Sequence, residues 1–235
     1  AILRGHVTPT ISVAMAERSP WIVEHRTEVR ETQRHVLDLF DGVLAERMGF
    51  DLLRDVQLLS PTRKGPLGVD ALNIELQRLL QRKLWGVEVE PPRRGWRPEL
   101  LVHDRVIQTK NNYDLGVMNG AIGVVVNVDR RAGTLLVRFD AEDVLYAREE
   151  QQQLSLAYAL TIHKVQGSEF PCVVVVMHKA HSFMHHRNLF YTAVTRAKEV
   201  AIVVGDAWGM RHCAETEQVE RRKTFLSVLD LPAQR

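Results

Sequence analysis

The chain has 235 residues, of which 45% are hydrophobic, and its formal net charge is +2 at pH 7. This length provides enough material for a packed core in one large domain or in two smaller ones. A charge so close to neutral excludes a uniformly basic nucleic-acid-binding protein, so any contact with nucleic acid has to use a local basic surface.

Hydropathy and cysteine content favour an intracellular protein. No run of the sequence approaches the ~20 apolar residues that a membrane span requires, and the first residues lack the pattern of a secretory signal. Two cysteines, Cys172 and Cys213, are too few for a zinc framework. We therefore expect packed free thiols, a cytoplasmic location and no membrane contact.

The first part of the chain alternates between strand and helix patterns. Apolar residues recur at helical spacing over 32–47 and 69–84, and short apolar runs at 21–24 and 55–60 predict strands. Gly49 marks the end of the first helix. Strand, helix, strand, helix is typical of an α/β lobe with a parallel sheet.

The pattern changes after residues 90–98, a stretch rich in proline and arginine that interrupts helix and strand alike. Between residues 101 and 154 the apolar runs are short and extended, which predicts a small β-barrel without a helix. The expected strands cover residues 105–108, 123–128 and 134–139, with a turn at 129–133 between the last two.

The α/β pattern resumes at Ser155. The valine run within 171–177 suits a central parallel strand with helices on both faces. A further strand is expected over 200–205, and a C-terminal helix around 219–229.

Polar residues from Thr161 to Phe170 stand between two apolar runs, which is where open α/β sheets place their ligands. We expect a strand-end loop and a short helical turn here. Gly167 permits a backbone geometry that a side chain would block, so that nearby amides can approach an anion. Glu169 is a natural acceptor for a sugar hydroxyl.

A second polar segment lies about two dozen residues later, from Arg187 to Lys198. Its apolar residues follow helical spacing as far as Ala197 and predict one buried stripe. Arg196 falls on the other side of that stripe, free to project toward a cleft.

These two segments resemble motifs V and VI of superfamily 1 helicases, in the form found in RecD-like DNA helicases and the exodeoxyribonuclease V alpha subunit. The run 58–73 is similar to the motif IV region, and 104–123 resembles the start of a small β insertion in that family. Four matches in the family's order are far more specific than any one of them alone.

The resemblance implies a fold and a domain organisation. The fold is an α/β, RecA-like lobe with a parallel sheet, interrupted by a small SH3-like β-barrel. Residues 1–94 and 155–235 would form the two parts of the lobe, called 2A, and residues 95–154 the 2B insertion.

The resemblance also implies roles at a nucleotide site. Arg196 would reach the γ-phosphate of ATP, where a fixed guanidinium offsets charge that develops in phosphoryl transfer. Arg63 would be a second γ-phosphate contact. Gln166, Gly167 and Glu169 would bind the nucleotide. For an arbitrary arginine, a solvated surface position is the commoner outcome.

Three residues are assigned to nucleic acid in the same way. Thr161 and His163 would contact single-stranded DNA, although isolated residues of these types are more often a helix cap and a satisfied histidine. Asn112 would line the DNA path, while turn formation is the competing interpretation. Val165 departs from the family pattern, in which serine is common, and removes any hydroxyl contact at that position.

Two motifs that an ATPase needs are missing from the chain. No stretch reads G-x-x-x-x-G-K-[S/T], and no apolar strand ends in the paired acids that hold nucleotide-bound Mg²⁺. The family carries both in its first RecA-like lobe, and the opening residues 1–5 resemble the connection that leaves it. We therefore expect the C-terminal part of a larger helicase, which binds ATP and Mg²⁺ only together with the N-terminal lobe.

By resemblance, the whole protein would be an ATP-dependent 5′–3′ DNA helicase, with recombination or repair proteins as further partners. One alternative is a non-catalytic module that binds single-stranded DNA or a protein, although the presence of Glu169 and Arg196 speaks against it. Another is an RNA helicase or the helicase part of a conjugative relaxase, because contacts with backbone phosphates do not separate DNA from RNA.

A cluster of histidines raises the question of a metal site. His181, His185 and His186 lie close together, but they have no neighbouring cysteine or acidic partner. We expect no metal there.

Overall fold

The computed structural model describes residues 2, 19–93, 95–140 and 142–217. Its centre is a five-stranded sheet in the order β1-β10-β9-β2-β8, in which every pair of neighbours is parallel. This confirms the predicted parallel sheet. Its strands are β1 (Trp21–His25), β2 (Val56–Ser60), β8 (Ala159–Thr161), β9 (Phe170–Met177) and β10 (Ala197–Gly205).

The valine run forms the middle strand, β9. Because successive side chains of a strand point to opposite faces, Val174 and Val176 enter one core while Val173 and Val175 enter another. All four are fully buried. The strand is therefore apolar on both faces, as predicted.

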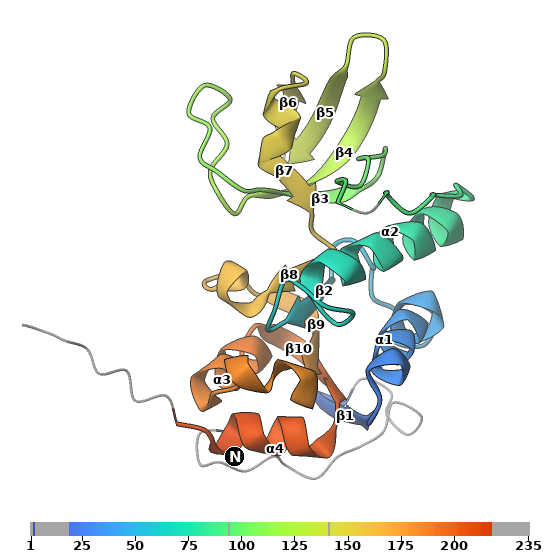
Figure 1. Ribbon diagram of the computed structural model, residues 1–235. Helices are drawn as coiled ribbons and strands as arrows, with labels where there is room; N and C mark the ends of the chain where they lie inside the picture. Colours follow the sequence, from blue (N-terminus) through green and yellow to red (C-terminus); the bar gives the residue numbers. More distant parts are fainter. Residues whose placement is uncertain (1, 3–18, 94, 141, 218–235) are drawn as a thin grey trace, which may run out of the picture.

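Helices cover both faces of this sheet (Figure 1). Helices α1 (Val29–Asp38) and α2 (Val69–Trp85) pack on one face, and α3 (Arg187–Val194) and α4 (Ala207–Glu215) pack on the other. The helix predicted over 32–47 begins earlier, and its second half, Leu39–Arg47, is π-helical. The result is a three-layer lobe.

A second sheet stands at one end of the lobe, beyond α2 (Figure 1). It is antiparallel, with the order β6-β5-β4-β3-β7. A 3-10 helix, Glu150–Gln153, interrupts what was predicted to be purely β. The strands are β3 (Arg105–Gln108), β4 (Ile122–Asp129), β5 (Thr134–Phe139), β6 (Glu142–Tyr146) and β7 (Leu154–Leu156).

Strand β7 runs across residues 154 and 155, where the sequence places a domain boundary. It pairs with β3 in the antiparallel sheet, and the parallel sheet is rejoined only at β8. Ala157 and Tyr158 alone separate the two strands. The connection back into the lobe is therefore very short.

A buried carboxylate fastens the antiparallel sheet to α2. Asp104 is fully buried and accepts hydrogen bonds from Nε2 of Gln77 (2.5 Å) and Gln81 (2.8 Å) on α2. It also accepts from the hydroxyl of Tyr158 (2.9 Å) and the amide of Leu101 (2.8 Å). Burial raises the pKa of this carboxyl, and the four donors partly offset that effect.

The neighbouring residue makes a second connection. Arg105 is buried and donates from Nη1 to the carbonyl of Val56 at 2.7 Å, so that β3 is tied to β2. Its guanidinium also lies over the ring of Phe170, 5.7 Å from the centroid. Burial lowers the pKa of Arg105 to about 10.

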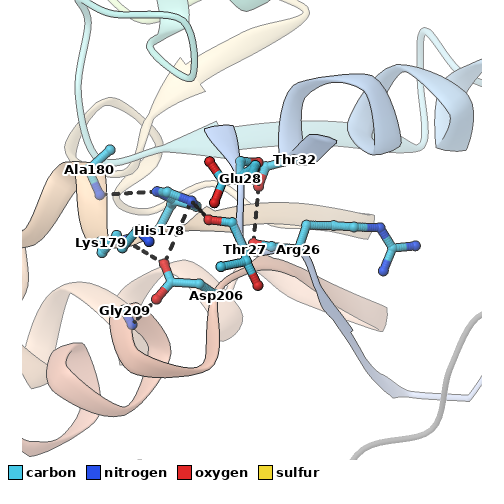
Figure 2. Close-up of polar contacts among 9 residues, drawn as sticks. All are labelled: Arg26, Thr27, Glu28, Thr32, His178, Lys179, Ala180, Asp206 and Gly209. Atoms are coloured by element: carbon cyan, nitrogen blue, oxygen red, sulfur yellow. Dashed lines mark hydrogen bonds and ion pairs between the residues drawn. The ribbon is translucent and has the colours of Figure 1, made fainter. Parts of the chain in front are cut away.

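The carboxyl ends of β1, β9 and β10 are joined by a polar network (Figure 2). The Nδ1 atom of His178 accepts from the amide of Ala180 at 3.0 Å, so Nε2 carries the proton and donates to the carbonyl of Thr27 at 3.0 Å. Asp206 accepts from the amides of Lys179 (2.5 Å) and Gly209 (2.9 Å). The network fixes the start of α4 against the end of β9.

Both cysteines are buried free thiols, as predicted, and burial raises the pKa of each to about 12. Among the described residues, no helix is long and apolar enough to cross a membrane. The predicted helix at 219–229 and the opening residues 1 and 3–5 lie outside the described part of the chain.

Candidate functional site

The segment 161–170 runs from the carboxyl end of β8 to the amino end of β9, and so connects opposite ends of the parallel strands. Thr161 ends β8 and pairs with Ser60 at the carboxyl end of β2. A 3-10 turn, Ile162–Val165, follows and is anchored by two buried side chains, Ile162 and Val165. The segment then returns to Phe170 at the amino end of β9.

The turn exposes the polar residues on which the predictions rest. His163, Gln166 and Glu169 are exposed, whereas Thr161 is half-buried. Gly167 has a φ of 90°, a backbone conformation that a side chain would disfavour. The predicted loop, its short helical turn and the need for glycine are confirmed.

Arg196 does not lie on a helix as predicted. Helix α3 ends at Val194, and Ala197, expected in its apolar stripe, is the first residue of β10. Arg196 lies in the turn between them and is half-buried. The apolar spacing continues past the helix end because a strand begins there.

The guanidinium of Arg196 is held by three oxygen atoms. Nη1 donates to the carbonyl of Ser168 (3.1 Å), Nε to the carbonyl of Thr192 (3.2 Å) and Nη2 to the hydroxyl of Thr195 (3.3 Å). The backbone carbonyl of Arg196 accepts from the amide of Phe170 at 2.8 Å. Arg196 is thereby joined to the loop that carries Gly167 and Glu169.

Glu169 and Arg196 therefore lie at the same edge of the sheet, the amino ends of β9 and β10. The carboxylate of Glu169 lies 3.9 Å from Nζ of Lys198, and both side chains are more than half exposed. Such a pair contributes little to stability. It leaves an accessible acceptor beside an accessible arginine.

A groove of about 1350 Å³ lies between the parallel lobe and the antiparallel sheet. Thr161 and Ser155 lie in its wall, together with the loop 95–100. Two of its arginines are paired with acids, Arg63 with Asp70 and Arg130 with Glu99. The basic side chains that line it are Arg63, Arg97, Lys110, Arg130, Arg148 and Lys164, and the acidic ones are Asp70, Glu99 and Asp129.

Charge in the groove is thus mostly positive, although the whole chain is nearly neutral. Lys164 connects its two walls, because its ammonium group donates to the side chain of Asn119 on the insertion. Sequence reasoning missed Arg97, Arg148 and Lys164. The last of these lies inside the motif V segment, which was the available signal.

The structure separates Arg63 from Arg196. Arg63 follows the carboxyl end of β2 and lines the groove with Thr161. Arg196 precedes β10, at the opposite end of the parallel strands. Among the described residues, no contact joins the two arginines.

Asn112 is engaged within its own loop. Its Oδ1 accepts from the amide of Leu115 (3.0 Å), and its Nδ2 donates to Oε1 of Gln153 (3.2 Å). Its backbone pairs with Val117. The geometry is that of a turn-forming residue, and a DNA contact at Asn112 stays a prediction.

The histidines before α3 lie in a 3-10 turn, Lys179–Met184, and its continuation. His181 and His185 are buried, and burial lowers the pKa of each to about 4. The Nδ1 of His186 accepts from the amide of Leu189 at 3.0 Å and caps α3. Within the described ranges, no group of three or more metal-binding side chains is present.

Comparisons with known proteins agree with this architecture. Residues 156–204 match the family of UvrD-like helicase C-terminal domains. Residues 72–139 match the SH3 domain of ATP-dependent RecD-like DNA helicases, a match that begins inside α2, ahead of the predicted insertion.

Curated relatives are similar over most of the chain. An ATP-dependent RecD2 DNA helicase from Deinococcus radiodurans is 41% identical over 171 residues, which are 73% of this chain and 23% of that protein. The RecBCD enzyme subunit RecD from Mycolicibacterium smegmatis is 34% identical over 229 residues, 93% of this chain and 38% of that protein. The chain thus spans well under half the length of these relatives.

Among solved structures, the Pif1 helicase from Bacteroides in complex with ADP-AlF3 and ssDNA is 18% identical, with a TM-score of 0.45. The match covers 85% of this chain and 50% of that one. A likeness of this size carries no conclusion about function.

The parallel lobe, its inserted sheet and the two family matches together define a superfamily 1 helicase C-terminal domain. Within that class, the chain belongs to the RecD-like helicases and carries their SH3 domain.

Proposed function

We propose that this chain is the second motor lobe of an ATP-dependent 5′–3′ DNA helicase. It would bind single-stranded DNA in the groove and complete an ATP site formed with a first RecA-like lobe. One observation carries this proposal: the segment 161–170 has Thr161 and Lys164 at the groove and Glu169 beside Arg196 at the other end. We propose that this segment couples the two ends.

On the nucleotide side, Arg196 would contact the γ-phosphate, and Glu169 would accept a hydrogen bond from the ribose. Gln166 and Gly167 would border the nucleotide, with Gly167 leaving space for close approach of the backbone. ATP and Mg²⁺ supply the phosphoryl group and its charge neutralisation when bound. The half-buried guanidinium suits this role, because its partners Ser168 and Thr192 are neutral carbonyls that do not cancel its charge.

On the DNA side, Thr161, His163 and Lys164 would contact the strand, with phosphates attracted by the basic side chains of the groove. Arg63 was predicted to contact the γ-phosphate. Its place in the groove beside Thr161 supports a contact with the DNA backbone instead, and we propose that role.

The test is Arg196→Ala in the complete helicase. We expect DNA-stimulated ATP hydrolysis to fall by at least ~10³-fold, since an arginine finger contributes on the order of 10³–10⁵ to kcat, with nucleotide binding largely kept. Arg211→Ala, in α4 and outside the motif segments, is the matched control. Normal turnover in Arg196→Ala would refute the assigned role.

A further inference from the structure

The loop that forms one wall of the groove presents an exposed aromatic ring. Trp96 is 70% exposed and lies among the residues that line the groove. Large apolar side chains with this much exposure carry a free-energy cost in water that a bound ligand can relieve. The Trp96 ring thus differs from the buried aromatic side chains Phe40 and Phe190 in the two cores of the lobe.

The ring is not on a loosely attached loop. Nη1 of Arg97 donates to the carbonyl of Gln152 at 2.8 Å, which ties the loop to the segment before β7. Nε2 of Gln77 donates to the carbonyl of Glu99 at 2.8 Å, which ties it to α2. The amide of Trp96 itself donates to the carbonyl of Arg93 at 2.8 Å and closes a turn. The loop is therefore held at both walls of the groove.

A cation lies over the exposed indole ring. The guanidinium carbon of Arg93 lies 6.0 Å from the Trp96 ring centroid. The exposed ring leaves room for a flat ligand to stack, and a nearby basic group attracts a phosphate attached to that ligand. A nucleobase on a phosphodiester strand combines both properties.

We propose that Trp96 stacks on a base of single-stranded nucleic acid bound in the groove. This rests on the proposed function, because it assumes that the groove holds the strand. Basic side chains such as Lys110 and Lys164 then bind phosphates, while Trp96 supplies a contact to a base that is independent of sequence. Stacking on an open strand also discriminates against a duplex, whose bases already stack on each other.

The experiment measures binding of this chain to a fluorescein-labelled oligothymidylate at low salt, by anisotropy. Trp96→Ala is expected to weaken binding by roughly 5- to 140-fold, the range for loss of one stacked base. Trp96→Phe keeps an aromatic face and is expected to retain most of the affinity. Trp208→Ala, which removes another exposed tryptophan outside the groove, is the matched control and is expected to bind as the unaltered chain does.

An abasic oligomer of the same length separates stacking from backbone contacts. Trp96→Ala and the unaltered chain should bind it equally. If Trp96→Ala and the unaltered chain bind oligothymidylate with equal affinity, the stacking role is overturned. If Trp96→Ala loses the same affinity for both oligomers, the stacking role is also overturned, because that result would point to a distorted loop. If the unaltered chain binds neither oligomer, the proposed DNA groove itself is refuted along with the stacking.

Discussion

Nη1 of Arg196 donates a hydrogen bond to the backbone carbonyl of Ser168 at 3.1 Å. This bond joins the turn before β10 to the loop before β9, two segments 28 residues apart in sequence. It also orients the guanidinium toward the edge of the sheet where Glu169 lies. The hydroxyl of Thr195 completes this arrangement, since it accepts from Arg196 and donates to the carbonyl of Thr192 at 3.2 Å.

Thr195 is therefore a positioning residue for Arg196, and Thr195→Val should loosen the guanidinium. We expect kcat for DNA-stimulated ATP hydrolysis in the complete helicase to fall by about 2- to 10-fold, which corresponds to one hydrogen bond. The KM for ATP should stay unchanged. Thr195→Ser, which keeps the hydroxyl, should restore kcat. A Thr195→Val enzyme with the wild-type kcat would contradict this role.

Gly68 allows the loop that carries Arg63 to close. A Cβ at this position would lie 2.5 Å from the carbonyl oxygen of Arg63 and 2.4 Å from that of Lys64. Gly68→Ala should force the loop away from α2, weaken binding of single-stranded DNA several-fold and destabilise the chain by about 1–3 kcal/mol. Anisotropy and urea unfolding measure the two effects.

Gly42→Ala is the control for that substitution, because a Cβ there meets its nearest atom at 3.8 Å. We expect it to leave DNA binding unchanged. Unaltered DNA affinity in Gly68→Ala would show that the position of this loop does not affect the groove.

Asp104→Ala should strongly destabilise the chain. It removes the acceptor of the Tyr158 hydroxyl and of one N–H of each glutamine amide, Gln77 and Gln81, whose Nε2 atoms keep their bonds to backbone carbonyls. An unsatisfied buried group costs about 1–3 kcal/mol. We expect a loss of at least about 3 kcal/mol in the free energy of urea unfolding. Asp143→Ala removes an exposed carboxylate paired with Arg138 and should change little. Similar unfolding midpoints for the two variants would argue against a structural role for Asp104.

His181 and His185 should make stability depend on pH. Burial lowers the pKa of both to about 4, whereas the unfolded value is about 6.5. The unfolded chain thus binds more protons in this window, so stability is complete above about pH 6.5 and falls as the pH drops toward 4. Between pH 7 and pH 5 we expect a loss on the order of a few kcal/mol for the two histidines together.

Urea unfolding at a series of pH values measures this loss. His185→Phe keeps an aromatic ring in the same packing without a titrating group, and it should reduce the pH dependence by about half. An unchanged slope in that variant would assign the acid sensitivity to other groups.

Much of the lobe could be predicted because the residue types in it indicate their own burial and backbone conformation. A valine run as long as that of β9 requires apolar contacts on both faces, and it lies in the centre of the sheet. Gly167 could be identified because few other residues adopt its backbone conformation. The motif order then indicated which strand ends carry polar loops.

Features that the sequence does not reveal depend on contacts between distant segments. Whether Arg63 lies near Arg196 follows from which strand ends face the same way, and only the strand order and register determine that. Helix α3 was predicted too long because Ala197 fits helical spacing and strand packing equally well. Trp96 could not be recognised as a candidate binding residue from the sequence, because aromatic residues are common in such loops. Only the structure shows that its loop lines a groove.

In the described part of the chain, the short link from β7 to β8 and the hydrogen bonds of buried Asp104 hold the inserted sheet against the lobe. If the proposed function holds, the two walls of the groove should therefore move together and keep their separation. Binding and release of a strand would then require this chain to move relative to the first RecA-like lobe. The inserted sheet would move together with the lobe to which it is attached.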